Sequence, residues 1–511
     1  MANYVLTTFC VCLHLSFVLS AIVPVSNSSA SLDPVLSESC QILGQRFPNQ
    51  LHWPGTEQYT NENSLYWSKT TLVTPYCIFT PENANHVSAA VIELHRTQTQ
   101  FAVRSGGHMP VKGAAGTNQG VLIAMTRMNS TALSTDGGIA SIGPGLRWGD
   151  VYNWLSTEDR VVVGGRYAPV GVSGVLLGGG MSHFSATHGW AANNVVNFEL
   201  VLANGTIASA NATANSDLFW ALKGSSSNHG IVVRFDLRTY PASPMYAGTI
   251  SYEESQVQQF LHAFQNWLSP GGGIRDEATA IVPALFIYPE ERSVQANIVV
   301  LQNNYTLNQT VPKSLQGFVN ISSASNTAHV RTYPDFLTET TQYGNRSNRN
   351  TFYATSLLAT ADAVRLINET IPPIALSMLE GVQNSFVGLS MQPVTKSHLQ
   401  AARDAGGDAL DLDPNDGDFI AFNLVVEYTN EQDDATVISF NTAALQALDT
   451  ASKAANIYYP FQFLNDAGAG EQVFSLYGKG KSLERMKSIR RAYDPDGVFQ
   501  DLMPGGFKIG V

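Results

Sequence analysis

The chain has 511 residues, more than one ordinary hydrophobic core accommodates, so its length favours two large domains. Hydrophobic residues make up 44% and charged residues 14% of the sequence, which excludes an intrinsically disordered chain. The formal net charge of −12 argues against a nucleic-acid-binding protein, because neutralising phosphates requires an excess of lysine and arginine.

The N-terminal segment is apolar from Val5 to Val25 and is followed by small residues. This pattern is typical of a secretory signal peptide, and we assign residues 1–25 to it. A signal-anchor helix is the alternative, because the segment is nearly long enough to span a bilayer and no Lys or Arg precedes it. Since the sequence contains no second hydrophobic span, we expect no membrane association once the signal is cleaved.

Two further features favour a secreted protein. Cys10 and Cys12 lie inside the predicted signal, which leaves Cys40 and Cys77 as a pair that we expect to form a disulfide in an oxidising compartment. The chain also carries N-x-S/T acceptors for glycosylation at Asn27, Asn129, Asn204, Asn211, Asn304, Asn308, Asn320, Asn345 and Asn368. Heavy glycosylation and a negative surface together predict a monomer.

Strands and helices alternate through the first half of the chain. Period-two and short apolar runs predict strands over residues 76–79, 100–104, 121–124, 139–142, 195–202 and 231–237. Apolar residues at i, i+3 and i+4 predict helices over 85–95 and 148–155. Between them, the nineteen residues from Gly171 to Gly189 contain six glycines, which predicts loops without regular helix.

The second half has fewer glycine loops. Residues 253–268 have the pattern of an amphipathic helix, and residues 280–287 and 296–301 that of strands, with further alternation up to residue 455. We predict a second domain that is built on an antiparallel sheet and shapes a substrate pocket. The tail contains a predicted helix over 482–493, and Asp494–Gly497 is a strong turn signal.

The most informative short motif is Arg104-Ser105-Gly106-Gly107-His108 at the end of a predicted strand. Two glycines after a strand allow successive backbone N–H groups to converge on a diphosphate, which predicts a phosphate-bearing cofactor. His108 then lies beside the cofactor, where a neutral imidazole nitrogen can attack an electrophilic flavin methyl group. A turn histidine without a role is the alternative.

The second glycine block, Gly171 to Gly180, is placed where a second wall of a cofactor site is needed. A flexible surface loop is the alternative, but Val175, Leu176 and Leu177 within the block argue against exposure to solvent.

Competing motifs are absent or incomplete. The sequence has no phosphate-binding P-loop and no H-E-x-x-H, and the context of Ser173 does not match the nucleophile elbow of a serine hydrolase. Gly143-Pro144-Gly145 lacks the third glycine of the dinucleotide fingerprint. The acidic run Asp411–Gly417 departs from a calcium loop in glycine position and in its last ligand, so we predict no metal site.

Several motifs in order resemble FAD-linked oxidases of the berberine-bridge-enzyme type. They are RSGGH, GVSGVLLGGGMSHFSATHGW, NNVVNFELVLANG, DLFWALKGSSSNHGIVVRF and the C-terminal RRAYDPDGVF. The resemblance implies an α+β fold with a two-subdomain, vanillyl-alcohol-oxidase-type FAD-binding domain at 36–245. It also implies a substrate domain at 246–455, with an antiparallel sheet flanked by helices, and a segment at 456–511 that returns to the FAD-binding domain.

The resemblance also implies cofactor contacts. His108 matches the family's histidine that bonds to the flavin 8α-methyl carbon, and Asn465 resembles the family's asparagine near the flavin ring, with Phe463 in place of the usual tyrosine. The remaining FAD-binding positions are Arg104, Ser105, Gly106, Gly107, Gly171, Val172, Ser173, Gly174, Gly179, Asn228, Gly230 and Val232. Many relatives attach FAD twice, but Tyr167 occupies the place of their cysteine, so we predict a single link through His108. The absence of that cysteine puts in doubt the large oligosaccharide substrates of doubly linked relatives.

The expected reaction transfers a hydride from a small organic substrate to flavin, with dioxygen as the reoxidant. Tyr458 and Tyr459 are the candidate catalytic bases, His183 and His188 are weaker candidates, and core aromatic residues are the alternative for the two tyrosines. A secondary-metabolite intermediate is the preferred substrate. The alternatives are a mono- or oligosaccharide oxidase and a non-catalytic, secreted ligand-binding glycoprotein; the two glycine blocks argue against the latter.

Overall fold

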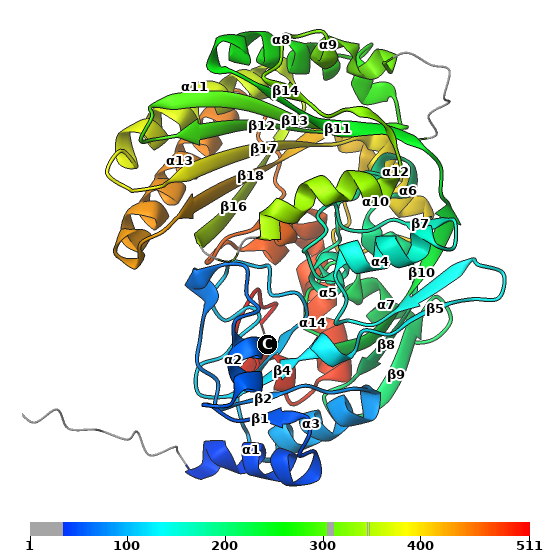
Figure 1. Cartoon of the computed structure of the whole chain (residues 1–511). Helices are drawn as coiled ribbons and strands as arrows, with labels where there is room; N and C mark the ends of the chain where they lie inside the picture. Colours follow the sequence, from blue (N-terminus) through cyan, green and yellow to red (C-terminus); the bar gives the residue numbers. More distant parts are fainter. Residues whose placement is uncertain (1–33, 304–310, 345, 347, 511) are drawn as a thin grey trace, which may run out of the picture.

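Three sheets organise the molecule into two halves (Figure 1). The computed structural model describes residues 34–303, 311–344, 346 and 348–510, so the predicted signal peptide and the acceptors Asn27, Asn304, Asn308 and Asn345 lie outside the described residues. Within these ranges, no helix is both long enough and apolar enough to cross a membrane.

The lower half in Figure 1 contains two of the sheets. A four-stranded sheet has the order β1-β2-β4-β3, in which β2, β4 and β3 are parallel, and a six-stranded antiparallel sheet has the order β5-β6-β10-β8-β9, with β7 paired to β10. The strands are β1 Leu51–His52, β2 Cys77–Phe79, β3 Phe101–Arg104, β4 Val121–Ala124, β5 Thr131–Leu133, β6 Ile139–Ile142, β7 Arg160–Val162, β8 Val195–Val201, β9 Ile207–Asn211 and β10 Ile231–Pro241. The helices are α1 Pro34–Arg46, α2 Glu57–Asn63, α3 Ala84–Arg96, α4 Trp148–Ser156, α5 Val172–Leu177, α6 Ser185–His188 and α7 Ser216–Leu222.

The upper half is built on an eight-stranded antiparallel sheet of order β14-β11-β13-β12-β17-β18-β16, with β15 paired to β11. Its strands are β11 Met245–Tyr252, β12 Thr279–Tyr288, β13 Ser293–Gln302, β14 Ser325–Asn326, β15 His329–Arg331, β16 Arg349–Leu358, β17 Phe386–Val394 and β18 Phe419–Tyr428. The helices of this part are α8 Val257–Trp267, α9 Gln316–Val319, α10 Tyr333–Leu337, α11 Ala361–Met378, α12 Lys396–Asp404 and α13 Asp434–Ala454. The predicted α+β architecture, with an antiparallel sheet flanked by helices, is confirmed.

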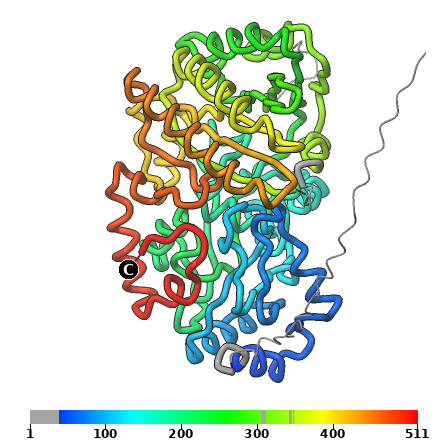
Figure 2. Tube along the Cα trace, turned by 90° about the vertical axis from the view of Figure 1, so that its left-hand side faces the viewer, coloured from blue at the N-terminus to red at the C-terminus, as the bar shows by residue number. Residues whose placement is uncertain are grey.

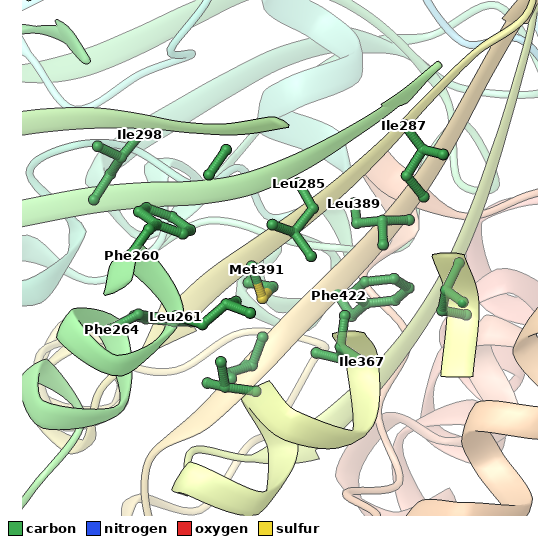
Figure 3. Close-up of a cluster of buried hydrophobic side chains, with 14 of the residues drawn as sticks. Phe260, Leu261, Phe264, Leu285, Ile287, Ile298, Ile367, Leu389, Met391 and Phe422 are labelled. Carbon is green, nitrogen blue, oxygen red and sulfur yellow. The ribbon is translucent and has the colours of Figure 1, made fainter. Parts of the chain in front are cut away.

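One face of the eight-stranded sheet is covered by helices, and Figure 3 shows this contact. Phe260 and Phe264 of α8 and Ile367 of α11 pack against strand residues that are themselves fully buried. These are Leu285, Ile287, Ile298, Leu389, Met391 and Phe422, and they share one side of their strands. Because successive side chains of a strand point to opposite faces, residues one position away face the other half of the molecule.

The C-terminal segment returns to the lower half, where Figure 2 shows it on the left of the trace. Helix α14 (Lys481–Tyr493) ends at Asp494, whose carboxylate accepts the N–H groups of Val498 and Phe499 at 2.8 and 2.9 Å. Farther along, Asn228 donates to the carbonyl of Phe507 at 3.0 Å. The first contacts shape the turn after α14, and the Asn228 hydrogen bond joins the end of the described chain to the segment just before β10, 279 residues earlier.

The predicted absence of helix in the glycine block is wrong. Residues Val172–Leu177 form α5 and Ser185–His188 form α6. The glycines lie mostly at the helix boundaries: Gly171 is the N-cap of α5 and Gly178 its C-cap. Within α5 only Gly174 carries the intrinsic helix cost of about 1 kcal/mol, which burial of Leu176 and Leu177 offsets.

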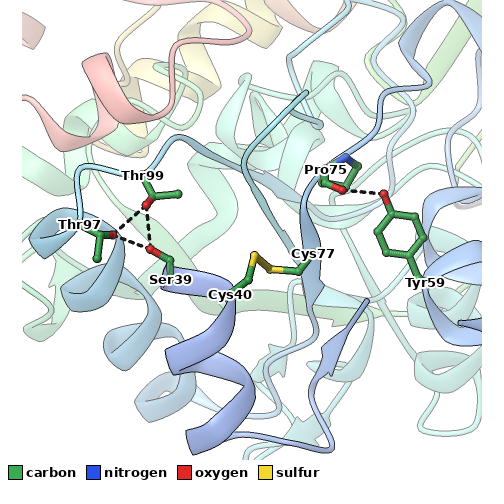
Figure 4. The surroundings of a disulfide bond; sticks show 7 residues. All are labelled: Ser39, Cys40, Tyr59, Pro75, Cys77, Thr97 and Thr99. Atoms are coloured by element: carbon green, nitrogen blue, oxygen red, sulfur yellow. Dashed lines mark hydrogen bonds between the residues drawn. A yellow bond between two sulfur atoms is a disulfide. The ribbon is translucent and has the colours of Figure 1, made fainter. Parts of the chain in front are cut away.

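The predicted disulfide between Cys40 and Cys77 is confirmed. It joins α1 to β2 (Figure 4), and both cysteines are fully buried. Beside it, the buried hydroxyl of Ser39 lies 2.5 Å from that of Thr97 and 2.8 Å from that of Thr99, so α1 is also tied to the end of α3. The bridge and this hydroxyl cluster fix the first helix to the four-stranded sheet.

Removing the bridge is expected to lower the free energy of unfolding. The cysteines are 37 residues apart, and the chain-entropy relation gives about 4 kcal/mol for a loop of that length. The measurement is urea denaturation with and without reductant. Reductant should shift the wild-type midpoint and leave that of the double variant Cys40→Ala/Cys77→Ala unchanged; equal midpoints for wild type and double variant would contradict a stabilising role.

Candidate functional site

A cavity of about 370 Å³ lies between the two halves. Its lower walls are the two glycine-rich loops, and its upper wall is the sheet face that the helices leave uncovered. The predicted positions that line it are Ser105, Gly106, Gly107, His108, Gly171, Ser173, Gly174, Gly230, Val232 and Asn465. Tyr167, at the place of the family's second attachment residue, also lines it.

The first loop follows directly from the end of β3. Gly107 has a φ of +65°, and a Cβ on it would lie 2.7 Å from the carbonyl oxygen of Leu65, so glycine is required there. The Trp67 N–H donates to the Gly107 carbonyl at 2.9 Å, and its indole stacks on the His108 imidazole with centroids 4.2 Å apart and ring planes 9° apart. Trp67 therefore fixes the plane of the imidazole at the cavity wall.

The two glycine loops are in direct backbone contact. A Cβ on Gly106 would lie 2.4 Å from the Gly171 nitrogen, and a Cβ on Gly171 would lie 2.4 Å from the Gly106 nitrogen. The Arg147 guanidinium donates to the Gly106 carbonyl at 3.1 Å and also to the Pro169 carbonyl. Burial lowers the pKa of Arg147. The two carbonyl groups belong to the two loops, so the guanidinium bridges them. The loops thus form one cradle.

Four predicted cofactor positions are not brought to the cavity wall. Arg104 is fully buried and forms an ion pair with Glu62 at 2.5 Å. Val172 packs in the hydrophobic core, and Gly179 lies against Leu410. The amide of Asn228 is used internally, since its oxygen accepts from Gln500 at 3.0 Å. Each belongs to a cofactor-loop motif in sequence but lies outside the cavity lining, and the side chains of Arg104, Val172 and Asn228 contact the protein interior behind the loops.

The candidate base residues also lie outside the cavity lining. Tyr458 packs under the ammonium group of Lys453, and Tyr459 stacks on Phe419 and donates to Asp416 at 3.3 Å. His183 lies 2.9 Å from the Tyr333 hydroxyl, where burial holds its pKa well below the usual range, and His188 packs on Tyr240. The structure therefore gives none of these four residues access to a ligand in the cavity, and the prediction of Tyr458 and Tyr459 as bases is not supported by their positions.

The cavity wall contains a polar group that the sequence analysis missed. Arg166 donates to the Gln392 amide oxygen, and the Gln392 amide nitrogen donates to Asp466 at 2.6 Å. The Asn423 amide donates to the Asp466 carbonyl at 3.1 Å. Burial raises the pKa of Asp466, although the Gln392 hydrogen bond and the Arg166 charge oppose this shift. A sequence signal existed for two of these residues, because Gln392 and Asn423 interrupt otherwise apolar strands.

Asn465 is held between the second glycine loop and the cavity. Its amide nitrogen donates to the Gly174 carbonyl at 2.6 Å, and its side chain occupies the space that a Cβ on Gly178 would need. Its buried amide oxygen has no partner among the described residues. The site therefore contains an acceptor that is available to a donor on a bound ligand.

Comparison with known proteins agrees with this geometry. The family described as an FAD binding domain matches residues 75–211. The chain is 35% identical to an FAD-dependent monooxygenase of Penicillium roqueforti, over 94% of this chain and 95% of that protein. A xylooligosaccharide oxidase from Myceliophthora thermophila superposes with a TM-score of 0.74 at 21% identity, over 92% and 99% of the two chains. A berberine bridge enzyme variant superposes with a TM-score of 0.71 at 15% identity, over 93% and 99%.

The contact between the glycine loops predicts that a side chain at Gly106 weakens FAD binding. Gly106→Ala places a methyl group against the Gly171 backbone, and such overpacking costs about 1–3 kcal/mol, so the affinity for FAD is expected to fall by about tenfold or more. The measurement is FAD bound per chain after purification and gel filtration. Gly381→Ala is the matched control, because a Cβ there meets nothing within 4 Å and the residue lies outside the cavity lining. Equal FAD content in the two variants would contradict the cradle.

Proposed function

Because the chain belongs to the FAD-dependent oxidoreductases of the berberine-bridge-enzyme type, within the vanillyl-alcohol-oxidase-like superfamily, we propose that it is a secreted oxidase of small, largely apolar organic molecules. Its substrate in this proposal is a secondary-metabolite intermediate. The observation that carries the proposal is that the paired glycine loops, His108 and the apolar face of the eight-stranded sheet all line one cavity.

The residues present fit FAD. The cradle of Gly106 and Gly171 excludes side chains at the point where two loops converge, and Asn465 offers an unused acceptor. In this proposal Ser105, Gly106 and Gly107 hold the diphosphate, and the remaining FAD contacts are Gly171, Ser173, Gly174, Gly230, Val232 and Asn465. Arg104, Val172, Gly179 and Asn228 keep the loops in shape. Bound FAD supplies a two-electron acceptor that takes a hydride from the substrate and passes the electrons to dioxygen.

The substrate class follows from the sheet face of the cavity. Its strands contribute Val282, Phe286, Val299, Phe386 and Val425, and polar groups are concentrated around Gln392 and Asn423. A sugar would place several hydroxyls against these apolar side chains and leave them without hydrogen bonds. We therefore favour an apolar molecule with one reacting polar group over a mono- or oligosaccharide; likeness to a xylooligosaccharide oxidase at 21% identity supports a shared fold.

Secretion and the domain division are part of the same proposal. The disulfide of Cys40 and Cys77 supports an oxidising compartment, and the acceptor residues Asn129, Asn204 and Asn320 are exposed. We propose that the FAD-binding domain comprises residues 36–245 and 456–511 and that residues 246–455 form the substrate domain. The proposed protein is monomeric.

We place the covalent attachment at His108 alone. Forming the link replaces a C–H bond of the flavin 8-methyl group by a C–N bond to the imidazole; the proton goes to solvent, and two electrons pass through the flavin to dioxygen. Tyr167 lines the cavity at the position of the second attachment residue of relatives and has no thiol to offer.

Acid precipitation tests this link. Wild-type protein should keep its yellow flavin in the precipitate, whereas His108→Ala should release it to the supernatant, because Tyr167 stands at the second attachment position. His262→Ala, on the exposed side of α8, is the control and should behave as wild type. Colour released from wild type would mean FAD without a covalent bond, and protein without flavin would refute the enzymatic proposal.

Trp67 should affect how fast the link forms. Stacking of this kind contributes about 0.5–1.5 kcal/mol beyond burial, so Trp67→Ala is expected to slow attachment between about twofold and tenfold, while Trp67→Phe retains part of the effect. The measurement is flavin fluorescence of the denatured chain on a gel, followed over time after FAD is added to apoprotein. Identical time courses for the three proteins would show that the stacked indole has no influence.

A monooxygenase is the second candidate, because the relative from Penicillium roqueforti is named an FAD-dependent monooxygenase. The two reactions differ in the fate of oxygen. An oxidase gives one peroxide per substrate oxidised and no label in the product from ¹⁸O₂, whereas a monooxygenase incorporates one labelled oxygen atom. Mass spectrometry of the product therefore decides between them.

A further inference from the structure

Since Tyr458 and Tyr459 lie elsewhere, the group that accepts the substrate proton has to be sought at the cavity wall. Four side chains that line the cavity can carry or exchange a charge: His108, Arg166, Tyr167 and Asp466. His108 is assigned to FAD attachment, and an arginine stays protonated in proteins. A carboxylate is the best proton acceptor of the remaining two.

We propose that Asp466 is the catalytic base and that Gln392 and Arg166 are positioning residues that hold its carboxylate toward the substrate. The inference rests on the proposed function and extends it by naming the acid–base group. In the step, the substrate O–H bond breaks and its proton binds Asp466. The released electron pair forms the second C–O bond as the hydride leaves carbon for FAD, and dioxygen is reduced to peroxide.

The orientation of Gln392 follows from its two neighbours. A guanidinium has only donors, so the amide oxygen of Gln392 has to face Arg166. Its amide nitrogen then faces Asp466 and donates to Oδ2 at 2.6 Å and to the carbonyl of Ala421 at 3.3 Å. Arg166 thus fixes the amide, and the amide fixes one carboxylate oxygen.

The other carboxylate oxygen is left for the substrate. Among the residues that the structure describes, no group donates to Oδ1 of Asp466, and the side chain is half-buried at the cavity. The backbone around it is fixed, because its N–H donates to the Phe463 carbonyl at 2.9 Å and its carbonyl accepts from Asn423. The preceding residue, Asn465, is bonded to Gly174 of the second glycine loop. Asp466 therefore lies where the proposed cofactor wall meets the sheet face.

The surroundings of Asp466 increase the proton affinity of its carboxylate. Burial raises the pKa of Asp466 above the ordinary value of 3.8, which increases its proton affinity, while Gln392 and Arg166 limit the shift. From β17 and β18 it is faced by the amides of Gln392 and Asn423, and from the loop before α5 by the Arg166 guanidinium; Tyr167 lines the same cavity. Because the base acts when ionised, activity should rise with pH through this pKa.

The test compares Asp466→Asn with wild type in anaerobic stopped-flow reduction of the bound flavin, with cinnamyl alcohol and vanillyl alcohol as probes between pH 4 and 9. Removing a general base lowers the rate by about 10²–10⁴-fold, so this loss and the disappearance of the acidic limb are expected. Asp404→Asn, on the exposed side of α12, is the matched control and should keep both rate and profile. Gln392→Met should keep the limb but move it to higher pH, because the donor that lowers the Asp466 pKa is lost.

Two readouts separate the base from a structural residue. Covalent flavin content and the thermal unfolding temperature of Asp466→Asn should match those of wild type. A rate within fivefold of wild type, an acidic limb that persists in Asp466→Asn, or a limb that disappears in Tyr167→Phe instead would overturn the proposal while leaving the oxidase assignment intact. A wild-type protein that holds FAD but is reduced by none of the probes would count against both.

Discussion

The two-residue alternation of the eight-stranded sheet is the constraint on which the rest of the architecture depends. Leu285, Leu389 and Leu424 face the helices α8, α11 and α13 and are fully buried there. Their neighbours Phe286, Ser390 and Asn423 then necessarily face the opposite side, where they line the cavity. The same strands therefore contribute core packing on one face and ligand-binding side chains on the other. A shift in register by one residue would exchange the two sets.

The lower half imposes a complementary constraint of space. Two loops can approach to backbone contact only where both lack side chains, as at Gly106 and Gly171, and the Arg147 guanidinium then bridges their carbonyl groups. A wall made of main-chain atoms presents N–H groups at fixed positions, which suits an anionic cofactor. Gln392 and Asn423, in contrast, contribute polar side chains from the sheet, and Asn465 and Asp466 contribute theirs from the tail.

Much of the fold was predictable from the sequence, because strands such as β4 and helices such as α3 have strong apolar periodicity. The glycine block was misjudged, since a glycine count does not distinguish residues inside a helix from residues that cap it, as Gly171 and Gly178 do. Motif matching found loop positions but not the direction of each side chain: Arg104 belongs to the RSGGH motif yet pairs with Glu62 behind it. The group of Arg166, Gln392 and Asp466 is distributed over three distant segments, and only the folded chain brings its members together.

The return of the C-terminal segment has a consequence for biosynthesis. Asn465, Asp466 and Phe507 line the cavity, and Asn228 is anchored to the carbonyl of Phe507, so the pocket remains incomplete until the segment from Asn465 to Phe507 has been synthesised. A complete binding wall therefore requires the segment from Asn465 to Phe507. A prematurely terminated chain lacks part of the binding wall, which couples flavin loading to the integrity of the whole polypeptide.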